Sequence, residues 1–201
     1  MLTALLVLQL FAPDWEAIYA KLEPSLVPVG FYRQFDEFVP ICTGVVVAPL
    51  RVVTEEHCLK ELPQVFVSGL PARIIKEQNQ AVLLGLDPPQ PSSWRPIRVA
   101  SARPRIGSPV MAIGYGFGTP QLIITIGHTA TKASLPGFPE HESDDVWFDL
   151  NAIGGMSGGP IVNAQGEVVS LTRGVMADGV PSPNSLTYGA STSSLIRLTK
   201  F

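Results

Sequence analysis

The chain has 201 residues, and 46% of them are apolar, enough for a sizeable core. Only 15% are charged and the net charge is −3, with no long basic run, which argues against a nucleic-acid-binding protein. Glycine (18) and proline (19) are both frequent, a composition typical of many short strands joined by turns.

The first segment, Leu2–Phe11, is predominantly apolar. It is too short to span a bilayer, and it has the length of a signal-peptide core without a preceding basic residue or a small-x-small cleavage motif. Two interpretations stay open: a leader or membrane-associated segment, or a packed N-terminal arm over 1–24. Within that arm Asp14 is the expected N-cap of a short helix, WEAIYAKL, which Pro24 ends.

Short apolar runs of strand length follow, punctuated by glycine, proline, asparagine and aspartate. They form two groups, separated by the proline-, serine- and arginine-rich stretch 87–108, which resists regular structure. The expected strands lie near 25–31, 42–48, 51–54, 64–68, 71–76, 80–86, 109–114, 120–134, 145–149, 160–163, 167–173 and 186–190.

This pattern predicts an all-β fold of two six-stranded antiparallel β-barrels in a single domain, with short N-terminal and C-terminal helices. The first barrel is expected over about 25–90, a linker over 91–107 and the second barrel over about 108–191. A closing helix is expected over 192–201.

One serine, Ser157, stands among four glycines in the stretch GGMSGGP. GMSGG matches the nucleophile motif of α/β-hydrolases, but that fold places its histidine after the serine. The three histidines here, His57, His128 and His141, all precede Ser157, and the chain lacks alternating strands and helices. The α/β-hydrolase interpretation therefore fails.

A histidine before the serine is the order of chymotrypsin-type enzymes. His128 lies in a strand-like run and His141 in an acidic loop, whereas His57 ends a strand directly beside Cys58. Cys42 begins the neighbouring strand, and antiparallel pairing would bring the two cysteines together. A Cys42–Cys58 disulfide is expected, with two buried free thiols as the alternative.

Several stretches together resemble the chymotrypsin-fold (trypsin-like) serine peptidases, and most of all the HtrA/Deg type without a PDZ module. They span about residues 14–198 and are CTGVVVAPLRVVTEEHC, QAVLLGLD, GSPVMAIGYGFG, FDLNAIGGMSGGPIVNAQGEVVSL and LTYGASTSSLIRL. The resemblance implies peptide-bond hydrolysis, with Ser157 as nucleophile and His57 as general base. It also implies an oxyanion hole made by the backbone N–H groups of Gly155 and Ser157.

The chain departs from this family at the acid of the triad, where Gln80 replaces an aspartate. An amide can accept a bond from the imidazole but supplies no charge, and the aspartate-to-asparagine exchange costs about 10⁴ in turnover. Three interpretations follow: a weak serine endopeptidase helped by Gln80, an enzyme that recruits Glu77, or an inactive homologue acting as a peptide-binding or assembly module. Asp87 is a poorer candidate, and Glu55 and Glu56 replace the small residues usual before the histidine.

The resemblance also implies a specificity pocket. Its expected lining consists of two segments, Asn151, Ala152 and Ile153 before the nucleophile, and Ser170, Leu171 and Thr172 on a neighbouring strand. Since Asn151 carries no charge, a small or medium apolar substrate residue is expected rather than lysine or arginine.

No metal site is expected, because the histidines and cysteines lack ligand spacing, and no cofactor motif is present. The expected partner is a peptide or protein substrate. Leu2–Phe11 is a candidate for homo-oligomer contacts, as in HtrA-type relatives, and a weaker one for membrane association. A disulfide would favour an extracytoplasmic or secreted location, whereas the incomplete leader does not, so the location stays open.

Overall fold

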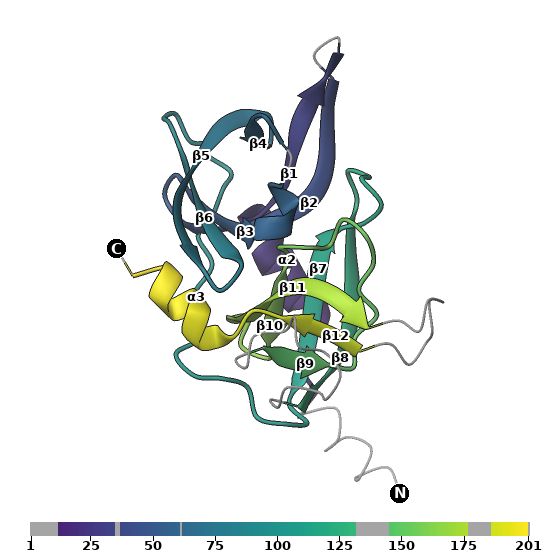
Figure 1. Cartoon of the computed structure of the whole chain (residues 1–201). Helices are drawn as coiled ribbons and strands as arrows, with labels where there is room; N and C mark the ends of the chain where they lie inside the picture. Colours follow the sequence, from purple (N-terminus) through teal and green to yellow (C-terminus); the bar gives the residue numbers. More distant parts are fainter. Residues whose placement is uncertain (1–11, 35–36, 61, 132–144, 177–185, 201) are drawn as a thin grey trace, which may run out of the picture.

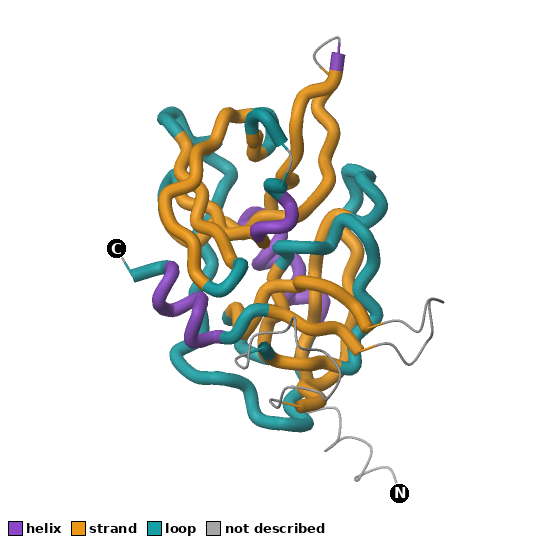
Figure 2. Tube along the Cα trace, in the orientation of Figure 1, coloured by secondary structure: helices purple, strands orange, loops and turns teal. Residues whose placement is uncertain are grey.

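The computed structural model describes residues 12–34, 37–60, 62–131, 145–176 and 186–200. Its strands form two adjacent closed antiparallel β-barrels, and in Figure 1 the first barrel lies above the second. The predicted all-β fold of two six-stranded barrels is thereby confirmed. The tube in Figure 2 shows how little of the described chain is helical.

The first barrel has the strand order β1-β2-β3-β6-β5-β4. Its strands all lie close to the ranges expected from the apolar runs. They are β1 (Leu26–Arg33), β2 (Glu37–Ala48), β3 (Arg51–Glu55), β4 (Val65–Val67), β5 (Leu70–Gln78) and β6 (Ala81–Leu86).

The second barrel has the order β10-β11-β12-β9-β8-β7. Its strands are β7 (Pro109–Tyr115), β8 (Leu122–Thr131), β9 (Val146–Phe148), β10 (Pro160–Asn163), β11 (Val168–Met176) and β12 (Leu186–Gly189). Strand β11 continues to Met176, beyond the expected end at residue 173.

Helix α2 (Trp15–Leu22) begins at Asp14, whose carboxylate accepts from the backbone N–H of Ala17, as expected of an N-cap. A 3-10 turn, η1 (Glu23–Ser25), leads into β1, and another, η3 (Glu56–Cys58), follows β3. Helix α3 (Thr192–Leu198) closes the chain with Ser191 as its N-cap. Among the described residues there is no helix with the length and apolar character needed to cross a membrane.

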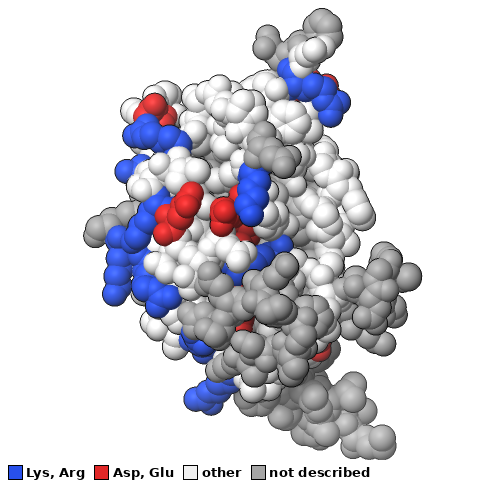
Figure 3. All heavy atoms as spheres, viewed as in Figure 1, with Lys and Arg blue, Asp and Glu red and all other residues white. Residues whose placement is uncertain are grey.

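One of three buried hydrophobic clusters among the described residues spans both barrels. A single buried cluster joins Val45 and Leu83 of the first barrel to Ile113 and Leu171 of the second, and Leu195 of α3 packs into it. Because close-packed interiors resist deformation, this cluster fixes how the facing loops of the two barrels meet. On the face drawn in Figure 3, acidic and basic side chains are interspersed over both barrels.

The boundaries between arm, barrels and linker stay predictions. The linker touches the second barrel through an isolated β-bridge between Val99 and Val168. The segment Leu2–Phe11, and with it the predictions of a leader, an oligomer contact or a membrane contact, lies outside the described residues.

Candidate active site

The turn that carries Ser157 packs directly against the first barrel. A Cβ atom at Gly158 would lie 2.2 Å from Oγ1 of Thr54 and 2.3 Å from the carbonyl oxygen of Thr43. The backbone at Gly158 also has a φ of +79°, and at Gly155 a φ of +93°. Only glycine tolerates both this conformation and this contact, which explains why the serine has glycine neighbours.

Thr43 of β2 is the main link between the serine turn and the first barrel. Its backbone N–H donates to the carbonyl oxygen of Ser157 at 2.8 Å, and its Oγ1 donates to the carbonyl oxygen of Gly155 at 2.9 Å. The same Oγ1 accepts from the N–H of Tyr115 at 2.8 Å. One buried threonine therefore fixes two carbonyl groups on either side of Met156.

These contacts orient the backbone N–H groups predicted to form the oxyanion hole. The carbonyl of Gly154 accepts from the N–H of Phe117 at 2.7 Å, and the carbonyl of Met156 accepts from Gly159 at 2.9 Å. In a planar trans peptide the C=O and N–H point in opposite directions. The N–H groups of Gly155 and Ser157 therefore point away from these partners, and neither donates to another described residue.

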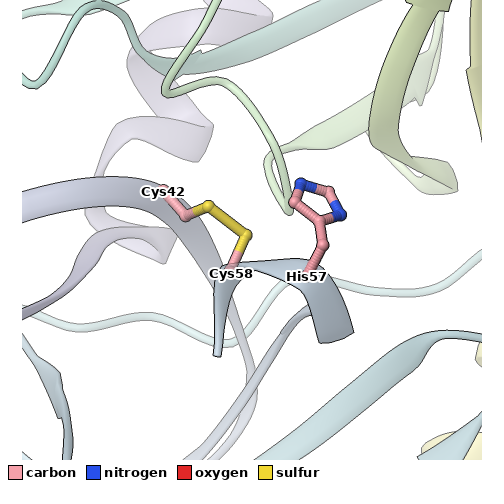
Figure 4. Close-up of side chains that lie close together, drawn as sticks. All are labelled: Cys42, His57 and Cys58. Atoms are coloured by element: carbon pink, nitrogen blue, oxygen red, sulfur yellow. A yellow bond between two sulfur atoms is a disulfide. The ribbon is translucent and has the colours of Figure 1, made fainter. Parts of the chain in front are cut away.

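His57 lies in the middle of η3, beside the Cys42–Cys58 disulfide (Figure 4). The predicted disulfide is present, with the two Cα atoms 6.0 Å apart. The carbonyl oxygen of Ser157 is 3.8 Å from Sγ of Cys58. The backbone of the serine therefore reaches the residue next to the histidine.

A ring nitrogen of His57 and the two sulfur atoms lie within 4.8 Å of one another. This group does not form a metal site, because the sulfurs are bonded to each other and offer no thiolate.

The surroundings of His57 favour its neutral form. Partial burial of the ring lowers the pKa of His57 below its ordinary value, and the positive charges of Arg173 and Lys60 lower it further, while Glu56 acts in the opposite direction. A neutral imidazole at neutral pH can accept a proton. Among the described residues neither the ring of His57 nor the hydroxyl of Ser157 has a hydrogen-bond partner; such bonds are often long before substrate binds.

The predicted acid position lies in a turn of two residues. Asn79 and Gln80 connect β5 to β6, and both have positive φ, +49° and +61°. The carbonyl oxygen of Gln80 accepts from the N–H of Glu56 at 2.6 Å, which ties this turn to the histidine turn. The side-chain amide of Gln80 has no hydrogen-bond partner among the described residues, so its predicted role beside His57 stays a prediction.

The other carboxylates considered from the sequence are engaged elsewhere or face solvent. Glu77 is exposed on β5, and Asp87 forms an exposed ion pair with Arg73 at 2.6 Å. Glu56 is 3.8 Å from Lys60 in a further ion pair. Glu55 differs from all of these, because it is completely buried.

Arg173 of β11 holds Glu55 in a buried charged cluster between the barrels. Its Nε donates to Oε2 of Glu55 at 2.9 Å, and its other nitrogens donate to Oδ1 of Asp145 at 2.7 Å and to the carbonyl oxygen of Asn79 at 2.6 Å. One guanidinium thus connects the end of β3, the β5–β6 turn and the start of β9.

The predicted pocket residues lie on two segments near the serine turn. Asn151 is exposed and Ala152 and Ile153 are partly buried, whereas Ser170, Leu171 and Thr172 are buried. Ser170 donates to the carbonyl oxygen of Ala190, and Leu171 packs in the shared core. The carbonyl of Thr172 accepts from the N–H of Gly158 at 2.7 Å. That these residues select a substrate side chain stays a prediction.

Sequence reasoning missed two residues, Thr43 and Arg173. The signal for Arg173 was available, since a single arginine interrupts the apolar run of β11, and a buried arginine needs acidic partners. Thr43 gave no such signal, because threonine is common in strands and its contacts depend on residues far along the chain.

A comparison with protein-family models agrees with this geometry. The model of the trypsin-like peptidase domain matches residues 42–171, which include the histidine turn and the serine turn. The chain belongs to the trypsin-like peptidase domain family. No curated protein sequence matches it significantly.

Solved structures of this trypsin-like fold resemble the chain over nearly its whole length. The inactive form of the Rv3671c protease matches with a TM-score of 0.68 and 19% identity, covering 94% of this chain and 98% of that one. The active form of the Rv3671c protease from M. tuberculosis has a TM-score of 0.68 and 21% identity, covering 93% and 86%. The HtrA-type protease AlgW with a decapeptide has a TM-score of 0.75 and 16% identity, covering 92% and 66%. These similarities show the shared fold.

Proposed function

We propose that this trypsin-like chain is a serine endopeptidase in which Ser157 attacks a peptide carbonyl and His57 accepts its proton. The Ser157 oxygen bonds to the carbonyl carbon, the C–N bond breaks, and His57 returns the proton to the leaving amine. Water then hydrolyses the acyl-enzyme by the same route. The N–H groups of Gly155 and Ser157 hold the oxyanion.

The orientation of the serine turn is the main support for this proposal. The carbonyl groups of Gly154 and Met156 are both held by backbone donors, and the N–H groups of Gly155 and Ser157 have no acceptor among the described residues. Two N–H donors available beside a serine match the demand of a tetrahedral intermediate. Losing one such donor typically costs about 10²–10³ in rate, which is several kcal/mol.

One observation favours a second candidate function, peptide binding without cleavage. The predicted acid position is a turn of two residues without a carboxylate, and the Gln80 amide has no hydrogen-bond partner among the described residues. A module of this kind would bind a peptide beside the serine turn and leave it intact. In AlgW a decapeptide is present in the solved structure.

A fluorophosphonate probe, which reacts with activated serines, distinguishes the two functions. The peptidase predicts covalent labelling that Ser157→Ala abolishes and His57→Ala reduces by at least about a hundredfold. Ser101→Ala, at an exposed serine, is the matched control and should label like the wild type. Absence of labelling at millimolar probe, with tight binding of peptides that stay intact, would establish the binding module instead.

A second variant tests the acid position. Gln80→Asp raises labelling by orders of magnitude if the turn places this side chain against His57, and leaves it unchanged if the side chain lies elsewhere.

The disulfide supports an oxidising, extracytoplasmic setting for the reaction. Mass spectrometry of the protein isolated under alkylating conditions tests this, since free thiols at Cys42 and Cys58 would contradict it.

A further inference from the structure

Arg173 is a buried arginine of the second barrel whose hydrogen bonds reach two segments of the first barrel. It lies on β11 and is 5% exposed. Its Nε donates to Oε2 of Glu55 at 2.9 Å, and its Nη2 donates to the carbonyl oxygen of Asn79 at 2.6 Å. Its Nη1 donates to Oδ1 of Asp145, directly before β9, at 2.7 Å. Because the guanidinium is planar and its five N–H groups form a rigid fork, this one side chain fixes the distance between the two barrels at this point.

The two acceptors in the first barrel are neighbours of groups that the proposed reaction uses. Glu55 is the last residue of β3, and the next three residues form η3, which holds His57. Asn79 forms with Gln80 the turn at the predicted acid position. A displacement of the Arg173 guanidinium would therefore move both the histidine turn and the turn at the acid position.

The strand that carries Arg173 also holds the serine turn. The carbonyl oxygen of Thr172 accepts from the N–H of Gly158 at 2.7 Å, and the N–H of Thr172 donates to the carbonyl oxygen of Gly159 at 2.8 Å. Thr172 and Arg173 are consecutive residues of β11. The backbone of one thus contacts the serine turn, and the side chain of the other contacts the segment that leads into the histidine turn. The spacing of the two turns therefore depends on these two adjacent residues.

The charge of Arg173 provides a separate way to detect its position. Partial burial of the ring is the largest cause that lowers the pKa of His57, and the positive charge of Arg173 is the next. Among the described residues Lys60 also lowers the pKa of His57, and Glu56 raises it. The turn 79–80 and the serine turn carry no acidic or basic side chain. Removal of the Arg173 charge should therefore raise the pKa of His57.

We propose that Arg173 is a positioning residue of this site, whose guanidinium holds the histidine turn and the Asn79–Gln80 turn in place against the serine turn. This inference rests on the proposed function, because it concerns how His57 is placed to take the proton of Ser157. Arg173 acts through the two turns that it holds. A lysine would not replace it, since a single ammonium group on a flexible stem cannot reproduce the planar fork.

The rate constant for labelling of Ser157 by the fluorophosphonate probe, measured from pH 5 to pH 10, tests the inference. Arg173→Lys keeps the charge and loses the fork, so the rate constant at high pH should fall at least about tenfold while the midpoint of the pH profile stays close to that of the wild type. Arg173→Met also removes the charge, so the rate constant should fall and the midpoint should move to higher pH. Arg73→Lys and Arg73→Met, at an exposed arginine paired with Asp87, are the matched controls and should leave both quantities unchanged.

A second variant covers a failure to fold. Arg173→Met alone leaves the buried Glu55 without its cation, which destabilises a folded protein. The double variant Arg173→Met, Glu55→Gln removes both members of this pair and should show the same upward shift of the midpoint. Near-UV circular dichroism of each variant reports whether the barrels are folded.

The outcomes separate this inference from the peptidase proposal. If the wild type labels and folded Arg173→Lys labels equally fast at every pH, the positioning role is overturned and the peptidase proposal stands. If the wild type does not label, the peptidase proposal fails, and an NMR titration of the His57 ring then decides on Arg173. A midpoint that rises in Arg173→Met or in the double variant, and not in Arg173→Lys, supports the placement of Arg173 against the histidine turn. The same midpoint in all of them overturns it.

Discussion

Thr43→Val removes the hydroxyl that connects the first barrel to the serine turn and keeps the shape of the side chain. Two hydrogen bonds are lost, one from Oγ1 to the carbonyl of Gly155 at 2.9 Å and one from the N–H of Tyr115 to Oγ1 at 2.8 Å. Each such bond contributes about 1 kcal/mol, and the unpaired groups left behind cost about 1–3 kcal/mol more. The expected loss of unfolding free energy is about 3–5 kcal/mol.

The matched control is Thr192→Val. Thr192 is buried to the same degree, and its Oγ1 makes one bond, to the carbonyl of Val169 at 2.6 Å, away from the serine turn. Its loss removes one bond and leaves one buried carbonyl unpaired, which should cost about 2–4 kcal/mol and leave the chemistry unchanged. Urea unfolding measures both free energies, and the rate constant of fluorophosphonate labelling measures the effect on Ser157.

Thr43→Val should lower that rate constant at least about tenfold, because the carbonyl of Gly155 is no longer fixed and the oxyanion donors lose their common orientation. Thr192→Val should change it less than about twofold. The proposed bracing role of Thr43 is refuted if both variants lose equal stability, or if Thr43→Val labels as fast as the wild type.

Three further outcomes follow. Replacing Cys42 and Cys58 together by alanine should lower the unfolding free energy by about 3 kcal/mol, since the disulfide closes a loop with a separation of 16 residues; dithiothreitol on the wild type should reproduce the loss. Gly155→Ala should reduce labelling at least about a hundredfold, because its φ is +93° and a Cβ would lie 2.3 Å from the carbonyl oxygen of Tyr115; an unchanged rate would contradict the assigned donor. Because the folded state raises the pKa of Glu55 from 4.5 to about 8, the stabilisation by its proton is full below pH 4.5 and is lost as the pH rises towards 8, at about 1.4 kcal/mol per pH unit. The urea concentration at the midpoint of unfolding should fall as the pH rises through this window in the wild type. In Glu55→Gln it should change little with pH in the part of the window where His57 is neutral.

The architecture was predictable because local patterns decide it. Most strands of the described residues contain a short apolar run bounded by turn residues, and Asp14 caps helix α2 with its short polar side chain as expected. The disulfide also followed from local spacing, since Cys42 and Cys58 lie on β2 and on the turn after β3, strands that are adjacent in sequence.

The site was predictable only in part, because the ion pairs buried beside it depend on contacts between distant residues. Glu55 and Arg173 are 118 positions apart, and nothing in either neighbourhood shows that they meet. Glu55 and Glu56 are adjacent acidic residues before the histidine, and the sequence does not distinguish them, yet Glu55 is completely buried. Its burial results from the packing of β3 against β11. The hydrophobic periodicity of the sequence does not reveal which distant strands pack together.

The two-residue turn between β5 and β6 limits how this molecule can change. The side-chain amide of Asn79 donates to Oγ of Ser194 at 3.0 Å. Lengthening the loop would disturb the bonds that both backbone carbonyls make with Glu56 and Arg173. Substitutions that change the residues near this turn are therefore better placed on the neighbouring strands than in a longer loop. Libraries intended to raise activity would best keep this loop length constant and vary the strand ends that surround it.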